Sequence, residues 1–209
     1  MRKIKFAPGE YYHIYNRGVD HRNIVKDKFD ADRLLQSLYE FNTEEITGGI
    51  YELSFKRNRP EITNNLVDII CYCLNPNHFH LLIKEIQEGG LSKYIHRFIG
   101  GYSKYFNKRY KRKGTLFEGP FKAKHISDND YLLHASAYIN LNDQVHQLPN
   151  VSLVRSSWIE YMKPKTSFCK TDIILSQFET VKSYKKFAED SLLLMLEKRS
   201  DYKDLLDTE

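Results

Sequence analysis

The chain has 209 residues, of which 41% are hydrophobic and 28% are charged. These proportions are typical of a folded globular protein and exclude a disordered or membrane-spanning chain, while the length excludes three domains. The net charge of +5 at pH 7 is mild. Cys71, Cys73 and Cys169 lack the spacing of a zinc site, so we expect reduced thiols and a cytoplasmic protein.

The N-terminal part of the chain predicts one strand and one helix. Residues 11–16 have the pattern of a strand, which the turn signal Asn16-Arg17-Gly18 ends. Apolar residues then recur at helical spacing and predict a helix over residues 30–45. Residues 54–65 are polar and contain a proline, so we expect a loop inserted between core elements.

The middle of the chain predicts a β-hairpin followed by a long helix. Residues 67–74 are apolar enough for a buried strand, and residues 78–84 have the pattern of a second strand. The turn Asn75-Pro76-Asn77 between them favours antiparallel pairing. The helix pattern runs from Leu91 to about Tyr110.

One further strand and several helices complete the predicted elements. Residues 121–126 predict a strand, and Ser127-x-x-Asp130 is a capping box that would begin a helix reaching about Asn142. After Pro149 the pattern predicts helices only, notably over residues 171–178 and 181–198.

The order of these elements is strand, helix, strand, strand, helix, strand. This order predicts an α+β fold, a ferredoxin-like (split β-α-β) sandwich with an antiparallel sheet. We expect residues 1–150 to form this domain and residues 151–209 to form a helical C-terminal extension.

Positive charge is concentrated in the middle of the chain. Residues 91–125 hold ten Lys or Arg and a single acidic residue, Glu118, interleaved with aromatic residues. Such a segment suits a nucleic acid, whose phosphates pair with the cations and whose bases stack on the rings. An ordinary amphipathic helix, with buried aromatics and solvated lysines, explains the aromatic residues equally well.

Two histidines one residue apart form the first candidate site. Side chains alternate along a strand, so His78 and His80 point to one face of the sheet and Phe79 to the other. Two adjacent imidazoles offer two ligands to a metal ion. Taken alone, the pair is more simply explained as two half-exposed strand residues.

The helix after residue 127 carries the second candidate. Tyr138 and Asn142 are four residues apart and therefore share a helix face. A phenol can act as a nucleophile, and an amide oxygen is a suitable ligand for a hard metal ion. Without further context, Tyr138 is a core aromatic and Asn142 a helix-end residue. His134 is four residues before Tyr138, and packing or solvation is its simpler explanation.

Segment 76–82, Pro-Asn-His-Phe-His-Leu-Leu, resembles the signature of the HUH single-tyrosine transposases, which include insertion-sequence and REP-associated enzymes. Three other segments resemble this family in the same order: 12–18 the first strand, 114–122 the approach to the last core strand, and 138–142 the nucleophile helix. The sequence departs from the family pattern at Asp143, where a proline is frequent, and in a longer polar insertion around residues 57–64.

The resemblance implies a DNA transposase that cleaves and rejoins single-stranded, hairpin-containing DNA, such as REP-like sequences or insertion-sequence ends. Tyr138 would form a 5′-phosphotyrosyl intermediate, and His78, His80 and Asn142 would hold Mg²⁺ or Mn²⁺. It further implies a monomer or homodimer associated with the nucleoid. We expect the DNA to contact a set of basic residues, namely Arg17, Lys104, Lys108, Arg109, Lys111, Arg112, Lys122 and Lys124.

Two other classes of protein remain open from the sequence. A non-catalytic nucleic-acid-binding module of ferredoxin-like fold would use sheet aromatics for stacking, but would leave His78 and His80 unexplained. A metal-dependent phosphodiesterase would hydrolyse its substrate with an activated water and would not need Tyr138. A domesticated transposase serving host DNA maintenance would have the same sequence features.

Overall fold

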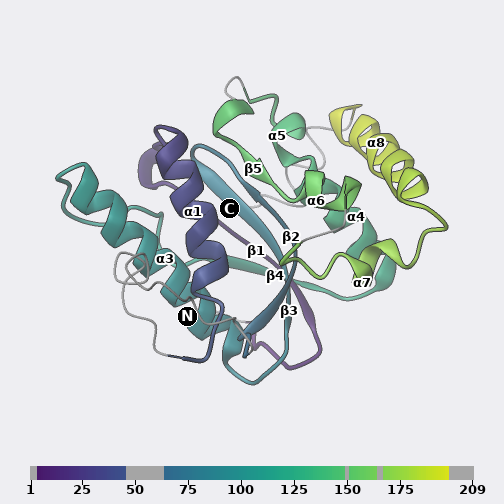
Figure 1. Ribbon diagram of the computed structural model, residues 1–209, viewed down its shortest axis with the longest axis horizontal. Coiled ribbons are helices and arrows are strands. Elements are labelled where there is room, and N and C mark those ends of the chain that lie inside the picture. The colour runs from purple at the N-terminus through teal and green to yellow at the C-terminus, as the bar shows by residue number, and fades with distance from the viewer. Residues whose placement is uncertain (1–3, 46–63, 149–150, 164–166, 198–209) are drawn as a thin grey trace.

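The computed structural model describes residues 4–45, 64–148, 151–163 and 167–197. The described residues form one five-stranded sheet with helices on both faces (Figure 1). The strands follow the order β4-β1-β3-β2-β5, and every neighbouring pair is antiparallel. Their bounds are β1 Tyr11–Arg17, β2 Val67–Leu74, β3 His78–Glu85, β4 Lys122–Ile126 and β5 Arg155–Ser156.

The first four strands confirm the predicted split β-α-β sandwich. Strand β3 lies between β1 and β2, and β1 lies between β3 and β4, so each helical connection passes over one intervening strand. The tight turn at residues 75–77 joins β2 directly to β3, as the sequence predicts. This arrangement places the strand that carries His78 and His80 at the centre of the sheet.

Two long helices cover one face of the sheet. They are α1, Lys28–Glu40, and α3, Gly90–Arg109, which lie together on the left in Figure 1. Their apolar sides bury residues such as Leu34 and Phe98 against Phe79 of β3. The aromatic residues of α3 that the sequence left open are therefore largely core residues: Tyr94, Phe98, Tyr102 and Phe106 are buried.

The opposite face is covered by helix α4, Asn129–Asn140, with α8, Val181–Glu197, packed behind it (Figure 1). A second apolar cluster on this side joins Leu82 of β3, Ile139 of α4 and Ala188 of α8. Cys71 and Cys73 are buried in the same cluster, and Cys169 is buried against the opposite face; all three are free thiols. The remaining short elements are η1 Val19–His21, α5 Asn142–Val145, η2 Val151–Leu153, α6 Trp158–Met162 and α7 Asp172–Leu175.

The structure differs from the sequence-based expectations at several element ends. Helix α1 runs over residues 28–40 rather than 30–45, because the chain turns away after Phe41. The cap of α4 is Asp128, whose carboxylate accepts a hydrogen bond from the Tyr131 N–H, while Ser127 donates to Asp128. The segment after residue 149 is not wholly helical, because β5 pairs with the end of β2.

The helix that carries Tyr138 does not continue to Asn142. Helix α4 ends at Asn140, Leu141 has φ −110° and ψ 19°, and Asn142 begins the separate helix α5. The prediction of one helix through both residues is therefore wrong, although the backbone keeps a helical course through bonds such as Val145 N–H to Leu141 C=O. No glycine or proline stands at this break, so no local signal marked it in the sequence.

The long polar insertion at residues 57–64 lies outside the described residues, except for Asn64. Within the described part of the chain, no helix combines the length and the apolar character that crossing a bilayer requires.

Candidate active site

Strand β3 and the turn before it fix the orientation of His78. Asn77 Oδ1 lies 2.6 Å from His78 Nδ1, and Asn75 Nδ2 lies 2.8 Å from His78 Nε2. An amide oxygen can only accept and an amide nitrogen can only donate, so this pattern puts the proton on Nδ1 and leaves a lone pair on Nε2. The turn therefore holds His78 in the tautomer that can bind a metal ion through Nε2.

Asn142 lies next to this lone pair. Its Oδ1 is 3.1 Å from His78 Nε2 and accepts a hydrogen bond of 2.7 Å from Asn75 Nδ2. Asn142 is fully buried, and no described residue provides a hydrogen-bond partner for its Nδ2. A ring nitrogen and an amide oxygen with their electron pairs side by side are two ligands that a cation would bring together.

His80 is the second histidine of the strand and is almost fully buried. It faces the same side of the sheet as His78, as the alternation along β3 predicts. Its Nδ1 lies 2.8 Å from Nε2 of His13, a buried residue of β1. No role was predicted for His13 from the sequence, although the period-two pattern of β1 could have placed it on this face.

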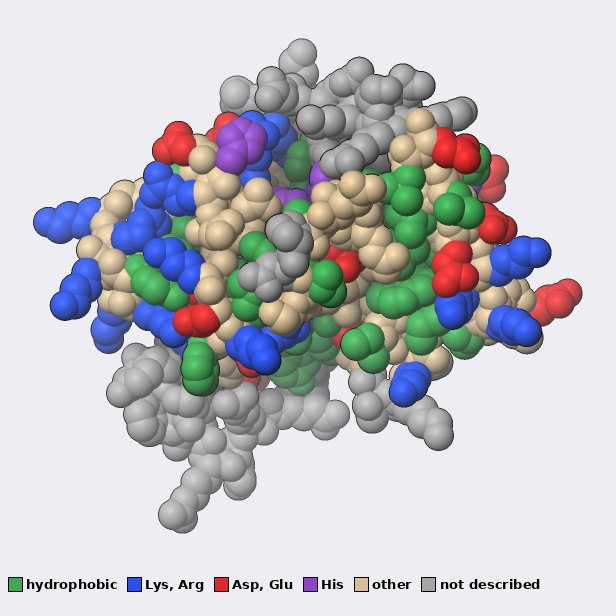
Figure 2. Space-filling view, turned by 90° about the horizontal axis from the view of Figure 1, so that it is seen from above, with side chains coloured by type: hydrophobic (Ala, Val, Ile, Leu, Met, Phe, Trp, Pro, Cys, Tyr) green, Lys and Arg blue, Asp and Glu red, His purple; other side chains and the backbone are tan. Residues whose placement is uncertain are grey.

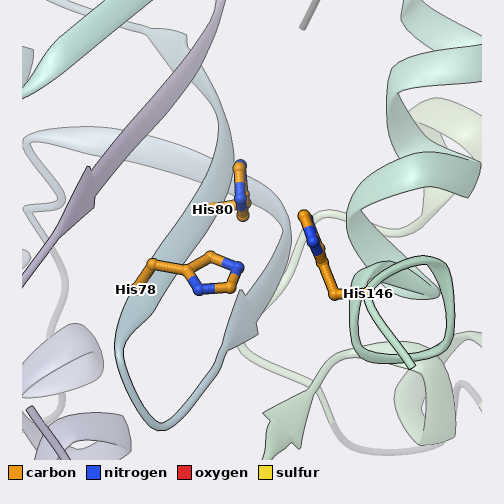
Figure 3. Close-up of side chains that lie close together, drawn as sticks. All are labelled: His78, His80 and His146. Atoms are coloured by element: carbon orange, nitrogen blue, oxygen red, sulfur yellow. The ribbon is translucent and has the colours of Figure 1, made fainter. Parts of the chain in front are cut away.

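A third imidazole completes the cluster. His146 directly follows α5, and one ligand atom from each of His78, His80 and His146 lies within 4.8 Å of the others. Figure 3 shows the two strand histidines on one side and His146 facing them from the end of the helix. His146 was not predicted from the sequence; its only signal is a position four residues after Asn142, one helical turn further.

Tyr138 packs directly against this cluster. Its ring is nearly perpendicular to that of His80, with 5.5 Å between the centroids, and lies 6.0 Å from the ring of His13. Only 4% of the residue is exposed. Helix α4 thus brings Tyr138 to His80 while α5 brings Asn142 to His78, so the structure gathers all four residues that the sequence predicts for the centre. His134 instead turns to α8, where its Nδ1 lies 3.3 Å from Ser191 Oγ.

Burial keeps these histidines neutral. Desolvation, assisted by the nearby His146 and Arg17 and opposed by Asn142, lowers the pKa of His78 to about 4. Desolvation also lowers the pKa of His80 well below its usual value and that of His13 to about 3. Neutral imidazoles are the form that binds metal ions, so the donor set fits a divalent cation near pH 7.

Three of the expected DNA-binding residues lie on the same face of the sheet as the histidines. Residues directly opposite in antiparallel strands share a face, and Arg17 is opposite His78. Lys124 is opposite His13, and Lys122 is opposite Tyr15, itself the partner of His80. Arg17 is also bound to Glu118, whose pKa it lowers through that hydrogen bond.

The other expected contacts lie on or just after α3, which covers the opposite face. Lys104, Lys108 and Lys111 are exposed. Figure 2 shows Lys and Arg side chains gathered on the left of the molecule, the side on which α3 lies in Figure 1. Arg109 is engaged by Asp27 and the buried Asp30, at 2.6 Å from each. Arg112 bonds Asn107 Oδ1 at 3.2 Å. The basic segment is thus divided between the two faces of the sheet.

The sheet thus carries a His-x-His pair on its central strand, and a tyrosine from a neighbouring helix is buried against that pair. Residues 56–142 match the family model described as "Transposase IS200 like". This segment, less than half of the chain, is therefore similar to the IS200-like transposases. No curated protein matches the sequence significantly.

Two solved structures are similar to the chain. One is described as a REP-associated tyrosine transposase bound to a REP hairpin; it is 15% identical, with a TM-score of 0.49, over 80% of this chain and 88% of that chain. The other is a putative transposase from Deinococcus radiodurans R1, 12% identical, with a TM-score of 0.39, over 63% of this chain and 91% of that chain. The α+β fold with its antiparallel sheet follows from this chain's own strand order.

Proposed function

We propose that this protein is an IS200-like transposase, which cleaves and rejoins single-stranded, hairpin-containing DNA with Tyr138 as its nucleophile. The phenol oxygen attacks the scissile phosphorus, the bond to the upstream 3′ oxygen breaks, and that oxygen takes up a proton to become a free 3′-hydroxyl. The phosphotyrosyl bond keeps the energy of the cleaved one, so another 3′-hydroxyl can reverse the step. The observation that carries this proposal is the packing of the Tyr138 ring against His80.

The residues that would hold the divalent ion, Mg²⁺ or Mn²⁺, are His78, His80 and Asn142, with His146 added by the structure. When bound, such an ion polarises a phosphate oxygen and stabilises the charge that develops during transfer. The imidazole-rich donor set favours Mn²⁺ over Mg²⁺, because imidazole suits transition metals and Mg²⁺ prefers oxygen ligands.

The DNA would approach from the histidine face of the sheet. Arg17, Lys122 and Lys124 stand on that face and would pair with phosphates near the cleaved bond. The exposed Lys104, Lys108 and Lys111 would contact a more distant part of the hairpin. Arg17, Arg109 and Arg112 already hold protein partners through their guanidinium groups, so each would exchange or share that partner when it contacts a phosphate.

Residues 1–150 would form the catalytic domain and residues 151–209 its extension. Helix α8 of this extension packs against α4 and so supports the helix that carries Tyr138. We place the protein in the cytoplasm, associated with the nucleoid, as a monomer or homodimer.

The test is the covalent adduct. The full-length protein, incubated with Mn²⁺ and a labelled single-stranded hairpin, should yield a protein–DNA species that survives a denaturing gel. Tyr138→Phe should abolish the adduct, because phenylalanine keeps the ring contact with His80 and removes only the hydroxyl. Tyr131→Phe, a matched change on the same helix, should leave the adduct intact.

The same gel separates the alternative functions. Cleavage that persists in Tyr138→Phe, without an adduct in the wild type, would show a hydrolytic phosphodiesterase. Binding of the hairpin without cleavage by either protein would show a non-catalytic module.

A further inference from the structure

His13 is a buried histidine that the proposed reaction does not use. It stands on β1, 1% exposed, next to the strand that carries the metal-binding pair. Its Nε2 lies 2.8 Å from His80 Nδ1. We propose that His13 is a positioning residue, which accepts the His80 Nδ1–H and so reserves His80 Nε2 for the metal ion. This inference rests on the proposed metal site.

Two neutral imidazoles share a single proton at this contact. A hydrogen bond between two ring nitrogens needs one protonated nitrogen and one lone pair, so two tautomeric arrangements are possible. If His13 donated, His80 would carry its proton on Nε2 and could not bind an ion. If His80 donates, Nε2 keeps its lone pair; only this arrangement is compatible with a metal at the cluster of His78, His80 and His146.

The rings have the geometry of such a bond. The planes of His13 and His80 differ by 25°, with 5.0 Å between centroids, so the N–H of one ring lies close to the plane of the other. Metal-binding histidines usually donate their second N–H to a neighbouring acceptor, which fixes the orientation of the ring. Here the acceptor is another histidine rather than a carboxylate, so no negative charge is added to the site.

His13 also touches the proposed nucleophile. Its ring stands at 77° to that of Tyr138, with 6.0 Å between the centroids. His13 therefore packs against both the ring that would bind the ion and the ring that would attack the phosphate. A single residue of β1 thus contacts both β3 and α4 at the proposed reaction centre.

Two substitutions test the role of the acceptor. His13→Gln places an amide oxygen near the position of Nε2, whereas His13→Leu removes any acceptor. Mn²⁺ affinity, measured by calorimetry on the full chain without DNA, should fall about 10- to 100-fold in His13→Leu and much less in His13→Gln. Wild-type affinity in a folded His13→Leu protein would overturn the proposal.

A second measurement does not depend on a variant that folds. Long-range ¹H–¹⁵N spectra of the metal-free wild type, with His80 assigned by the loss of its signals in His80→Asn, report which ring nitrogen carries the proton. We expect His80 to be protonated at Nδ1, and protonation at Nε2 would overturn the proposal. Failure of the wild type to bind Mn²⁺ would instead refute the proposed metal site. The spectra would still report the tautomer of His80, so the two outcomes can be told apart.

Discussion

At the scale of single residues, the centre is built from neutral donors. His13, His78 and His80 lie on one face of the sheet, and their burial depresses each pKa. Among the described residues, no carboxylate belongs to the cluster of His78, His80 and His146. In the proposed function the site would bind a cation through lone pairs alone, and the histidine cluster would be electrically neutral before the ion binds.

This neutrality predicts a loss of stability in acid. The unfolded chain protonates its histidines near pH 6.5, while the folded chain keeps His78 neutral to about pH 4 and His13 to about pH 3. Between pH 6.5 and 5 the unfolded state thus binds more protons, and the free energy of unfolding should fall by about 1.4 kcal/mol per pH unit for each such histidine. Urea titrations in EDTA measure this slope.

The control for this slope is His13→Gln, which removes one of the titrating groups. Its stability should depend less steeply on pH over the same interval. Equal slopes in the wild type and in His13→Gln would contradict the assignment of His13 as a group held neutral by the fold.

At the scale of elements, the C-terminal segment is tied to α4 by buried polar groups. Asn140 Nδ2 donates to the Tyr184 hydroxyl of α8 at 2.9 Å, and Asn140 Oδ1 accepts from Ser157 Oγ at 2.6 Å. Ser157 also bonds the backbone of Tyr72 in β2. One asparagine at the end of α4 thus joins the sheet to α8.

Removal of one hydroxyl tests this connection. Tyr184→Phe keeps the buried ring but deprives Asn140 Nδ2 of its acceptor, and should lower the free energy of unfolding by about 1–3 kcal/mol, the cost of a buried unpaired donor. Urea denaturation measures this change. Tyr39→Phe, at an exposed position of α1, serves as the control and should be near neutral. An equal and small effect of both substitutions would show that the network contributes little.

The sequence predicted the elements that have a strong local period and missed those set by contacts between distant segments. The hairpin of β2 and β3 follows from two apolar runs and an Asn-Pro-Asn turn. Strand β5 has only two residues and exists because it pairs with Cys73 and Leu74, far away in the sequence. The break between α4 and α5 at Leu141 likewise has no glycine or proline to mark it. The position of His146, which follows α5, could therefore not be predicted from the sequence. His78, His80, Tyr138 and Asn142 could be predicted to lie together because their spacing and resemblance are local, and the structure brings them together.

At the scale of the whole molecule, positive charge lies on both sides of the sheet. Arg17, Lys122 and Lys124 share the face of the histidines, and the exposed lysines of α3 lie on the covering layer opposite. A hairpin that contacts both groups must extend around an edge of the sheet. Strand β4 is one of the two edge strands and itself carries Lys122 and Lys124, so we expect the hairpin to extend around this edge.

Salt dependence measures which lysines neutralise phosphates. In the Tyr138→Phe background, binding of a single-stranded hairpin should weaken linearly on a log–log scale with salt. Lys122→Ala combined with Lys124→Ala should reduce that slope by about 0.7 for each phosphate that is no longer neutralised. Fluorescence anisotropy at several salt concentrations provides the slope. An unchanged slope would show that the histidine face is not the DNA-binding face.

The proposed ion ligands and their supports come from widely separated parts of the chain: His13 from the first strand, His78 and His80 from the third, and Asn142 and His146 from beyond α4. These residues span positions 13 to 146, so the proposed ion site exists only once β1, β3 and the segment after α4 have come together. A cation that binds this site would therefore stabilise the completed fold relative to every partly folded species. Partial unfolding that separates these elements would release the cation.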